Sequence, residues 1–295
     1  MLEVASRAGA RITRRHVPDG WELARGRPAL RLRALVRGYE GYRETLGRPL
    51  RRRELPSATI PVIVNFGAPY RILDPADPDD RSRLVEHRGG FVAGLHDTFS
   101  VTESTGAAHC LQINLSPLGA FRLFRRPMSD IAHQVVALED LLGRDAALLA
   151  ERLIEQPGWT PRFEALDAMI AARLAEAPRA SPEVAWAWRQ LTSSGGQVPI
   201  ATRVEELGWS PKRLIARFRE QIGLTPKQAA RLVRFERAAA EIAAGETGFD
   251  WDLFAPRHGF YDQSHLINEF RRFAGDTPEG LLRRRLPGNG GFASD

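Results

Sequence analysis

Two stretches near the carboxyl end of the chain repeat each other at a fixed offset of 52 residues. Residues 214–226 read LIARFREQIGLTP, and residues 266–278 read LINEFRRFAGDTP. Each copy follows a short turn, LGWS at 207–210 and GFYD at 259–262. The pattern predicts a helix, a tight turn and a second helix that ends at a glycine, and this unit occurs twice. Two such units can place equivalent helices in successive grooves of one DNA duplex, so the repeat indicates DNA binding.

The signals for helix ends agree in the two copies. Ser210 and Asp262 are suitable N-caps, and Gly223 and Gly275 stand where a glycine ends a helix. A Thr-Pro pair follows each glycine and restarts a helix by the same capping logic. Residues 227–244, between the copies, are predicted to form one long connecting helix.

The repeat also predicts which side chains face DNA. Leucine and phenylalanine four residues apart, as in Leu214 and Phe218, face the core, and the residues between them point outward. Polar side chains near the start of such a helix can reach base edges, while Arg219 and Arg271, one turn later, suit phosphates. His265 is expected to pack against a neighbouring helix or to cap its own helix rather than to read a base. The predicted DNA-contacting residues are Ser210, Lys212, Arg213, Ile215, Ala216, Arg219, Gln263, Ser264, His265, Ile267, Asn268 and Arg271.

Residues 182–286 resemble the DNA-binding domain of the AraC/XylS family of bacterial transcription regulators. The motifs that carry the resemblance are GGQVPIATRVEELGWSPKRLIARFREQIGLTP and GFYDQSHLINEFRRFAGDTP. The resemblance implies two helix-turn-helix units, with a rigid helix at about 227–244 holding them one DNA turn apart.

The chain departs from the family pattern at several positions. Family members often carry a polar residue and then Arg where Ile215 and Ala216 stand, and Arg where Asn268 stands. Ile215 could contact thymine methyl groups, or its helix could mainly bind the DNA backbone. Asn268 could pair with adenine. Pro256 falls in the support helix of the second unit, where a kink is expected.

The first half of the chain has a different pattern. Residues 60–66, 89–95, 98–104 and 109–115 are short, β-rich and broken by Gly, Pro and Asp, which favours a small barrel or sandwich. From Pro117 the apolar spacing becomes helical, notably at 128–156 and 161–176. The Pro/Ser break at 177–183 marks a domain boundary.

The predicted fold class is therefore α+β, with a β-barrel at about 20–115 and helices at about 117–178. A helical domain follows at 180–286, and residues 287–295 are expected to be a flexible tail. This layout resembles the regulatory half of AraC/XylS members, which implies a small cupin-like barrel for an effector and helices for dimerisation.

Few side chains in the first half of the chain could bind a metal or take part in a reaction. His87, His96, Glu103 and His109 could hold a metal but lack a tight His-x-His arrangement, so no metal and no cofactor are expected. Cys110 shares a strand face with Gln112 and Asn114, which predicts a half-buried, inert thiol. The alternative is a methyl-accepting or redox cysteine, which would need a base and a cationic pocket.

Charge does not locate the DNA-binding face. The net charge is +6, but residues 180–295 hold 16 Lys and Arg against 14 Asp and Glu, while residues 1–56 hold 14 Arg against 6 acids. The Arg-rich start is consistent with a solvated face, a flexible arm or a supplementary phosphate contact. No apolar run approaches the length of a membrane span, and the start lacks an apolar secretory segment, so no membrane partner and a cytoplasmic location are expected.

These patterns predict a sequence-specific DNA-binding transcription regulator controlled by an amino-terminal sensor or oligomerisation domain. Its partner is double-stranded DNA, with a small-molecule effector, RNA polymerase and a second copy of the chain as further candidates. No catalytic motif is found, so no enzyme is predicted. The alternatives are an enzyme or repair protein with a fused DNA-targeting module, and a non-specific architectural DNA binder.

Overall fold

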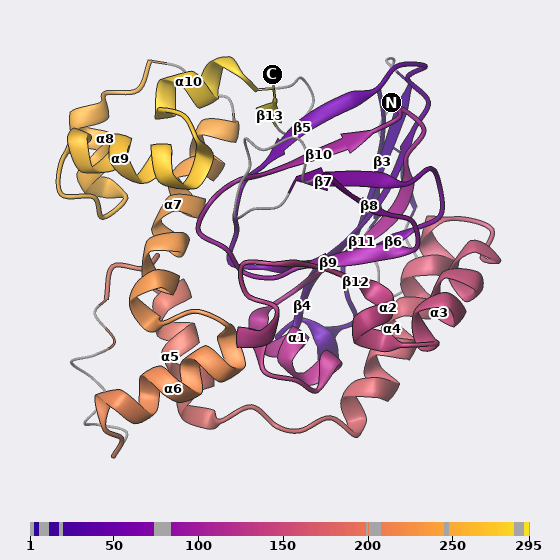
Figure 1. Cartoon of the computed structure of the whole chain (residues 1–295), viewed down its shortest axis with the longest axis horizontal. Coiled ribbons are helices and arrows are strands. Elements are labelled where there is room, and N and C mark those ends of the chain that lie inside the picture. Colours follow the sequence, from indigo (N-terminus) through magenta and orange to yellow (C-terminus); the bar gives the residue numbers. More distant parts are fainter. Residues whose placement is uncertain are drawn as a thin grey trace.

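The computed structural model describes residues 3–5, 12–17, 20–73, 84–198, 200, 208–244, 248–285 and 292–294. A barrel of two antiparallel sheets, flanked by helices, lies beside an all-helical carboxy-terminal domain (Figure 1). The α+β class predicted from the sequence is therefore confirmed.

The two sheets pack face to face. In spatial order the first sheet contains β1 (Glu3–Ala5), β2 (Ile12–Val17), β3 (Trp21–Gly26), β4 (Val36–Glu44), β11 (His109–Leu115), β6 (Ile60–Asn65), β9 (Gly90–Ala93) and β12 (Val135–Ala137). The second contains β13 (Phe292–Ala293), β5 (Leu50–Glu54), β10 (Ser100–Ser104), β7 (Tyr70–Leu73) and β8 (Leu84–His87). The strands predicted at 60–66, 89–95, 98–104 and 109–115 correspond to β6, β9, β10 and β11.

Strand β11 shows how the alternating pattern builds the barrel. Leu111 and Ile113 point outward into the main core, against the flanking helices. Cys110, Gln112 and Asn114 point into the barrel, because neighbouring residues on a strand face opposite sides.

The amino-terminal helices cover the outer face of the first sheet. They are η1 (Leu30–Leu32), α1 (Pro117–Phe124), η3 (Met128–Asp130), α2 (Leu138–Leu142), α3 (Asp145–Ile154) and α4 (Trp159–Ala175). The Tyr39 hydroxyl donates to Asp167 on α4 over 2.7 Å. Gly41 leaves room for the indole of Trp159, which would lie 2.2 Å from a Cβ at that position.

The helix predicted at 128–156 is wrong in its first half. A strand, β12, occurs inside it and pairs with β9, and His133 before it has a left-handed backbone (φ 61°). The apolar residues of this stretch are shared between helix and strand, and an unpaired edge of β9 decided which part became strand.

The carboxy-terminal helices are α5 (Pro182–Ser193), α6 (Pro211–Ile222), α7 (Pro226–Ala244), α8 (Trp251–Arg257), α9 (Gln263–Ala274) and α10 (Pro278–Arg283). The support helix expected before the first turn falls largely on residues 201–207, outside the described part. Pro256 lies in the last turn of α8, which ends one residue later, so this helix stops where a kink was expected.

The tail also differs from expectation. Phe292 and Ala293 form β13, which pairs with Arg53 and Arg52 of β5, and the Phe292 side chain is buried. A tertiary contact with the barrel thus orders residues that carry little local signal. Across the described residues, no helix combines the length and apolar character needed to cross a bilayer.

Candidate nucleic-acid interface

The second helix of each helix-turn-helix unit begins and ends with the same local devices. The Ser210 hydroxyl accepts a hydrogen bond from the backbone N–H of Arg213 (3.3 Å), and the Asp262 carboxylate accepts one from the backbone N–H of His265 (2.7 Å). Gly223 (φ 101°) and Gly275 (φ 67°) end α6 and α9 in the left-handed conformation, which glycine adopts without steric cost. The predicted caps are therefore confirmed.

Both helices expose the face that the repeat predicted. Their apolar faces are buried through Leu214, Phe218, Leu266 and Phe270. The exposed residues of the predicted set are Ser210, Lys212, Arg213, Ile215, Ala216, Arg219, Gln263, Ser264, Asn268 and Arg271. His265 and Ile267 are half-buried. Neither helix is hidden beneath the amino-terminal half.

Two aromatic residues in the turns belong beside this set, although the sequence analysis did not single them out. Trp209 and Tyr261 stand at equivalent positions of the repeat, and Tyr261 is 87% exposed. The guanidinium of Arg213 lies over the Trp209 ring at 4.5 Å. His265 accepts a hydrogen bond at Nδ1 from the backbone N–H of Tyr261 (3.1 Å), which agrees with a capping role. The signal that could have found both aromatics is the same 52-residue offset.

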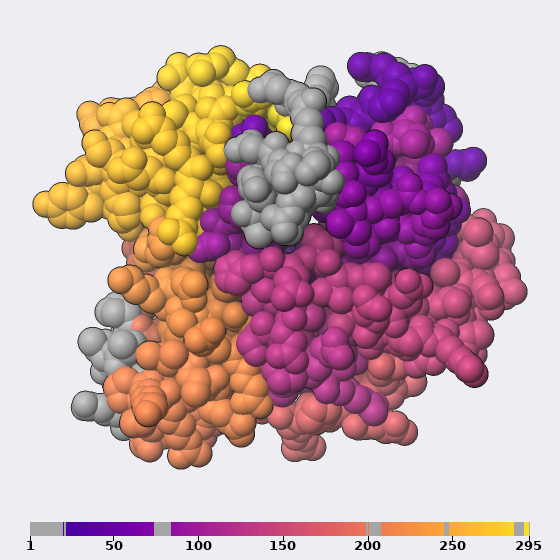
Figure 2. All heavy atoms as spheres, viewed as in Figure 1, coloured from indigo at the N-terminus to yellow at the C-terminus, as the bar shows by residue number. Residues whose placement is uncertain are grey.

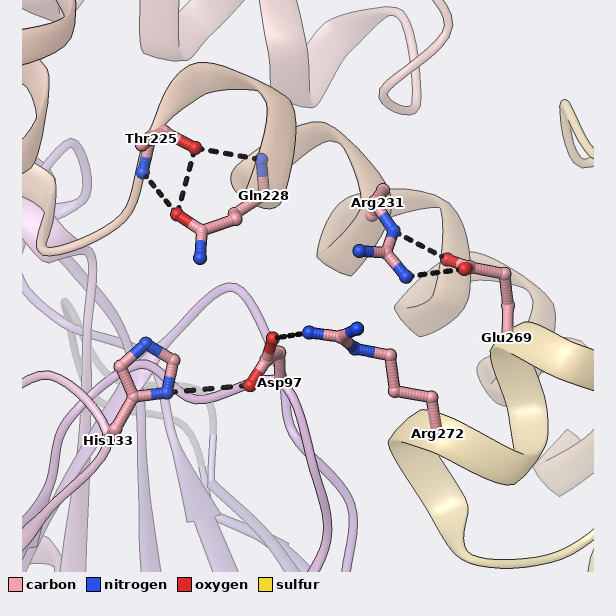
Figure 3. A network of polar contacts seen from close by, with 7 residues as sticks. All are labelled: Asp97, His133, Thr225, Gln228, Arg231, Glu269 and Arg272. Atoms are coloured by element: carbon pink, nitrogen blue, oxygen red, sulfur yellow. Dashed lines mark hydrogen bonds and ion pairs between the residues drawn. The ribbon is translucent and has the colours of Figure 1, made fainter. Parts of the chain in front are cut away.

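Helix α7 holds the second unit through a partly buried ion pair. Arg231 donates to both carboxylate oxygens of Glu269 on α9, over 3.0 and 2.5 Å (Figure 3). This hydrogen bonding raises the pKa of Arg231. At the start of α7, Thr225 and Gln228 bond each other reciprocally, as in a capping box. Aromatic contacts of Phe235 with the rings of Phe270 and Phe273, at 5.0 and 4.8 Å, complete the joint.

The carboxyl ends of both recognition helices contact the amino-terminal domain, at equivalent positions of the repeat. A Cβ on Gly223 would lie 3.1 Å from the carbonyl oxygen of Met128, and a Cβ on Gly275 would lie 2.2 Å from the Phe99 ring. The two ends of the helical domain thus touch different parts of the amino-terminal half, and the helix starts point away from it (Figure 1). In the space-filling view the helical domain, in orange and yellow, lies beside the amino-terminal half (Figure 2).

Polar contacts reinforce the docking of the second unit. Arg272 pairs with Asp97, which also lies 3.5 Å from the Nδ1 atom of His133 (Figure 3). Burial opposes ionisation of Asp97, but the hydrogen bond and charge of Arg272 outweigh it and lower the pKa of this carboxyl. Arg53 donates to the carbonyl oxygen of Ala274 over 2.5 Å.

A cavity of about 340 Å³ lies between the two sheets of the barrel. Its buried wall includes Ile63, Tyr70, Phe91 and Cys110. The Tyr70 hydroxyl lies 3.3 Å from the Cys110 sulfur, and burial raises the pKa of this thiol to about 12. Cys110 is more deeply buried than predicted, and it is protonated at neutral pH.

The four residues considered for a metal do not meet. His96 lines the cavity, whereas Glu103 pairs with Arg51 and Arg71. His109 contacts Arg162 over 3.1 Å, and His87 packs against Phe91. Among the described residues, no group of His, Cys, Asp and Glu is placed to hold a metal ion.

Comparison with known proteins gives two family matches. The family described as a helix-turn-helix domain matches residues 204–284, and a domain of unknown function (DUF6597) matches residues 24–137. No curated protein sequence matches significantly.

Solved structures of ToxT from Vibrio cholerae are also similar. The form bound to an unsaturated fatty acid is 11% identical, with 87% of this chain and 97% of that chain covered and a TM-score of 0.46. The form bound to (E)-4-(8-methylnaphthalen-1-yl)but-3-enoic acid is 14% identical, with 83% and 97% covered and a TM-score of 0.45. An oxalate decarboxylase from Bacillus subtilis is 12% identical over 53% of this chain and 38% of its own, with a TM-score of 0.19.

The duplicated, exposed recognition helices and the domain match define a DNA-binding transcription regulator. Its carboxy-terminal domain contains a helix-turn-helix domain at residues 204–284.

Proposed function

We propose that α6 and α9 read two successive major grooves on one face of a DNA duplex, with sequence specificity. The observation that carries this proposal is that equivalent faces of the two helices are exposed, with α6 beside the start of α7 and α9 packed further along it. Helix α7 has 19 residues. At 1.5 Å per residue it is about 28 Å long, comparable with the ~34 Å between grooves one DNA turn apart.

The exposed side chains divide into two roles. Asn268 has the donor and acceptor needed to bond adenine bidentately, and Gln263 and Ser264 at the start of the same helix reach base edges. Arg219 and Arg271, one turn further along their helices, bind phosphates. On α6 the exposed Ile215 suits a thymine methyl group.

We further propose that the barrel cavity binds a small-molecule effector. A cavity of about 340 Å³ with an apolar wall and convergent polar groups has the size and character of a ligand site. The helical domain touches the barrel beside this cavity: Glu236 of α7 accepts a hydrogen bond from the backbone N–H of Ala58 (3.2 Å), and Ser57 and Thr59 line the cavity. We assign the protein a non-catalytic role and a place in the bacterial cytoplasm, where its DNA lies.

Binding-site selection from random DNA with the full chain tests the DNA-reading proposal. We expect a consensus of two short elements about one helical turn apart. Selection that returns no consensus would favour an architectural DNA binder.

Two variants then separate the roles on the selected site. Asn268→Ala should reduce discrimination at one base position by about 1–3 kcal/mol. Arg271→Ala should weaken binding to all sequences and reduce the salt-dependence slope by about one. Arg217→Ala is the matched control, because Arg217 is exposed on α6 but pairs with Glu220 over 2.7 Å. Equal losses of affinity on specific and random DNA for Asn268→Ala would show that its base-reading role is wrong, and a loss confined to the selected site for Arg271→Ala would show that its phosphate role is wrong.

A further inference from the structure

We propose that the barrel cavity selects an uncharged amphiphilic ligand, with an apolar body and a hydroxyl or similar donor, and rejects an ionised carboxylate. This inference rests on the proposed effector site and specifies the chemistry of its ligand. It follows from the charges, the free acceptor and the apolar wall of the cavity.

The positive charges that face the cavity already have partners. Arg25 lies 3.5 Å from Glu40, and both line the cavity. Arg52 lies 2.9 Å from Glu44, whose side chain is fully buried, and it also contacts the Tyr42 hydroxyl. An anionic ligand would have to displace one of these carboxylates.

The negative charges facing the cavity balance the positive ones. Glu54 lines the cavity, accepts a hydrogen bond from the Thr102 hydroxyl (3.0 Å) and lies close enough to Arg52 to act on its charge. Among the described residues that line the cavity, the charged side chains are thus Arg25 and Arg52 against Glu40 and Glu54. A ligand carboxylate would leave water without gaining an unpaired cation, which is unfavourable.

His96 offers the acceptor that an uncharged ligand needs. Its Nδ1 lies 2.9 Å from the carbonyl oxygen of Gly94, and because a carbonyl can only accept, Nδ1 carries the proton. Nε2 is therefore an acceptor, and it is buried with no hydrogen-bond partner among the described residues. Burial lowers the pKa of His96, which keeps the ring neutral. His96 lines the cavity, and in the proposed complex the ligand hydroxyl donates to this nitrogen.

The rest of the wall is apolar. Ile63, Ile72 and Phe91 are buried and face the cavity, beside the buried Tyr70 and Cys110. These side chains suit a hydrocarbon or aromatic body, whose burial provides most of the binding free energy.

Binding of three probes with one chain length tests the inference on the full-length protein. The probes are 1-octanol, octanoate and octylammonium, measured by titration calorimetry at pH 7.5. We expect 1-octanol to bind at least about tenfold more tightly than octanoate, and more tightly than octylammonium.

Two variants make the test specific. Glu54→Gln keeps the bond from Thr102 but removes the negative charge beside Arg52, so octanoate should gain affinity while 1-octanol does not change. Ala93→Phe places a ring in the cavity, since Ala93 lines it, and should abolish 1-octanol binding. Circular dichroism confirms that each variant is folded.

The possible outcomes are distinct. Octanoate binding equal to or tighter than 1-octanol, abolished by Ala93→Phe, would overturn the ligand class but keep the effector site. If no probe binds, or if binding survives Ala93→Phe, the cavity proposal falls as well. Neither result affects the reading of DNA by α6 and α9, which site selection tests separately.

Discussion

The joint between α7 and the second reading unit provides the sharpest test of how the domain is held. Glu269 is 9% exposed and Arg231 is 24% exposed, and two hydrogen bonds join them. Replacing Glu269 by leucine leaves a largely buried guanidinium without its partner. Breaking a fully buried pair costs about 3–5 kcal/mol, and because water reaches part of Arg231 we expect about 2–3 kcal/mol.

Hydrogen exchange of the α7 and α9 amides measures this cost, since protection reports the free energy of local opening. Arg231→Met alone should cost a similar amount, because it leaves the Glu269 carboxylate buried. The double variant with Glu269→Leu should return to within about 1 kcal/mol of the original chain, since two apolar side chains can replace a buried ion pair. Arg271→Ala, an exposed change on the same helix, is the control and should leave exchange unaltered.

The double variant also separates stability from geometry. The ion pair fixes where α9 sits on α7, so operator affinity should stay reduced even where stability recovers. Single variants that lose less than about 0.5 kcal/mol would show that the aromatic contacts of Phe235 hold the joint without the ion pair.

Three further predictions concern the barrel and its docking. Truncation after Arg285 removes β13, so the β5 amides should exchange hydrogen at least about tenfold faster. Phe292→Leu should preserve most of the protection of these amides. Unchanged exchange after truncation would mean that the tail does not pair with β5. Cys110 should resist a thiol reagent at pH 8 until urea unfolds the chain. Because burial raises the pKa of this thiol from 9.0 to about 12, its contribution to the free energy of unfolding is complete below pH 9 and is lost as the pH rises toward 12. The Cys110→Ala variant should lose less stability than the original chain over that pH range. Asp97→Asn should loosen the docking of α9, detected as faster hydrogen exchange near Ala274, while the exposed Asp140→Asn should not. Since the pKa of Asp97 is lowered, the stabilisation by its ion pair is present above the ordinary pKa of 3.8 and is lost as the pH falls through the lowered pKa. Docking that persists in acid would contradict this role of Asp97.

The sequence by itself determined the helical domain and its exposed faces. Caps, glycine stops and apolar spacing are local signals, and a duplicated pattern gives each of them twice, so the positions of α6, α7 and α9 could be predicted closely. The four β-rich segments of the barrel were found for the same reason, because the alternation of apolar and polar residues can be recognised within each segment without knowing which strands it pairs with.

Only the tertiary structure decided the rest. Strand β5 carries three consecutive arginines at Arg51–Arg53, which give no strand signal, and it forms because β10 and β13 pair with it. The strand β12 and the docking of Gly223 and Gly275 on the amino-terminal half depend on pairings between segments far apart in the chain. The cavity and its balanced charges arise in the same way, since side chains such as Arg25, Glu54 and His96 meet only when the two sheets close. Local pattern specifies which residues face one side of an element, but what that side faces is set by long-range packing.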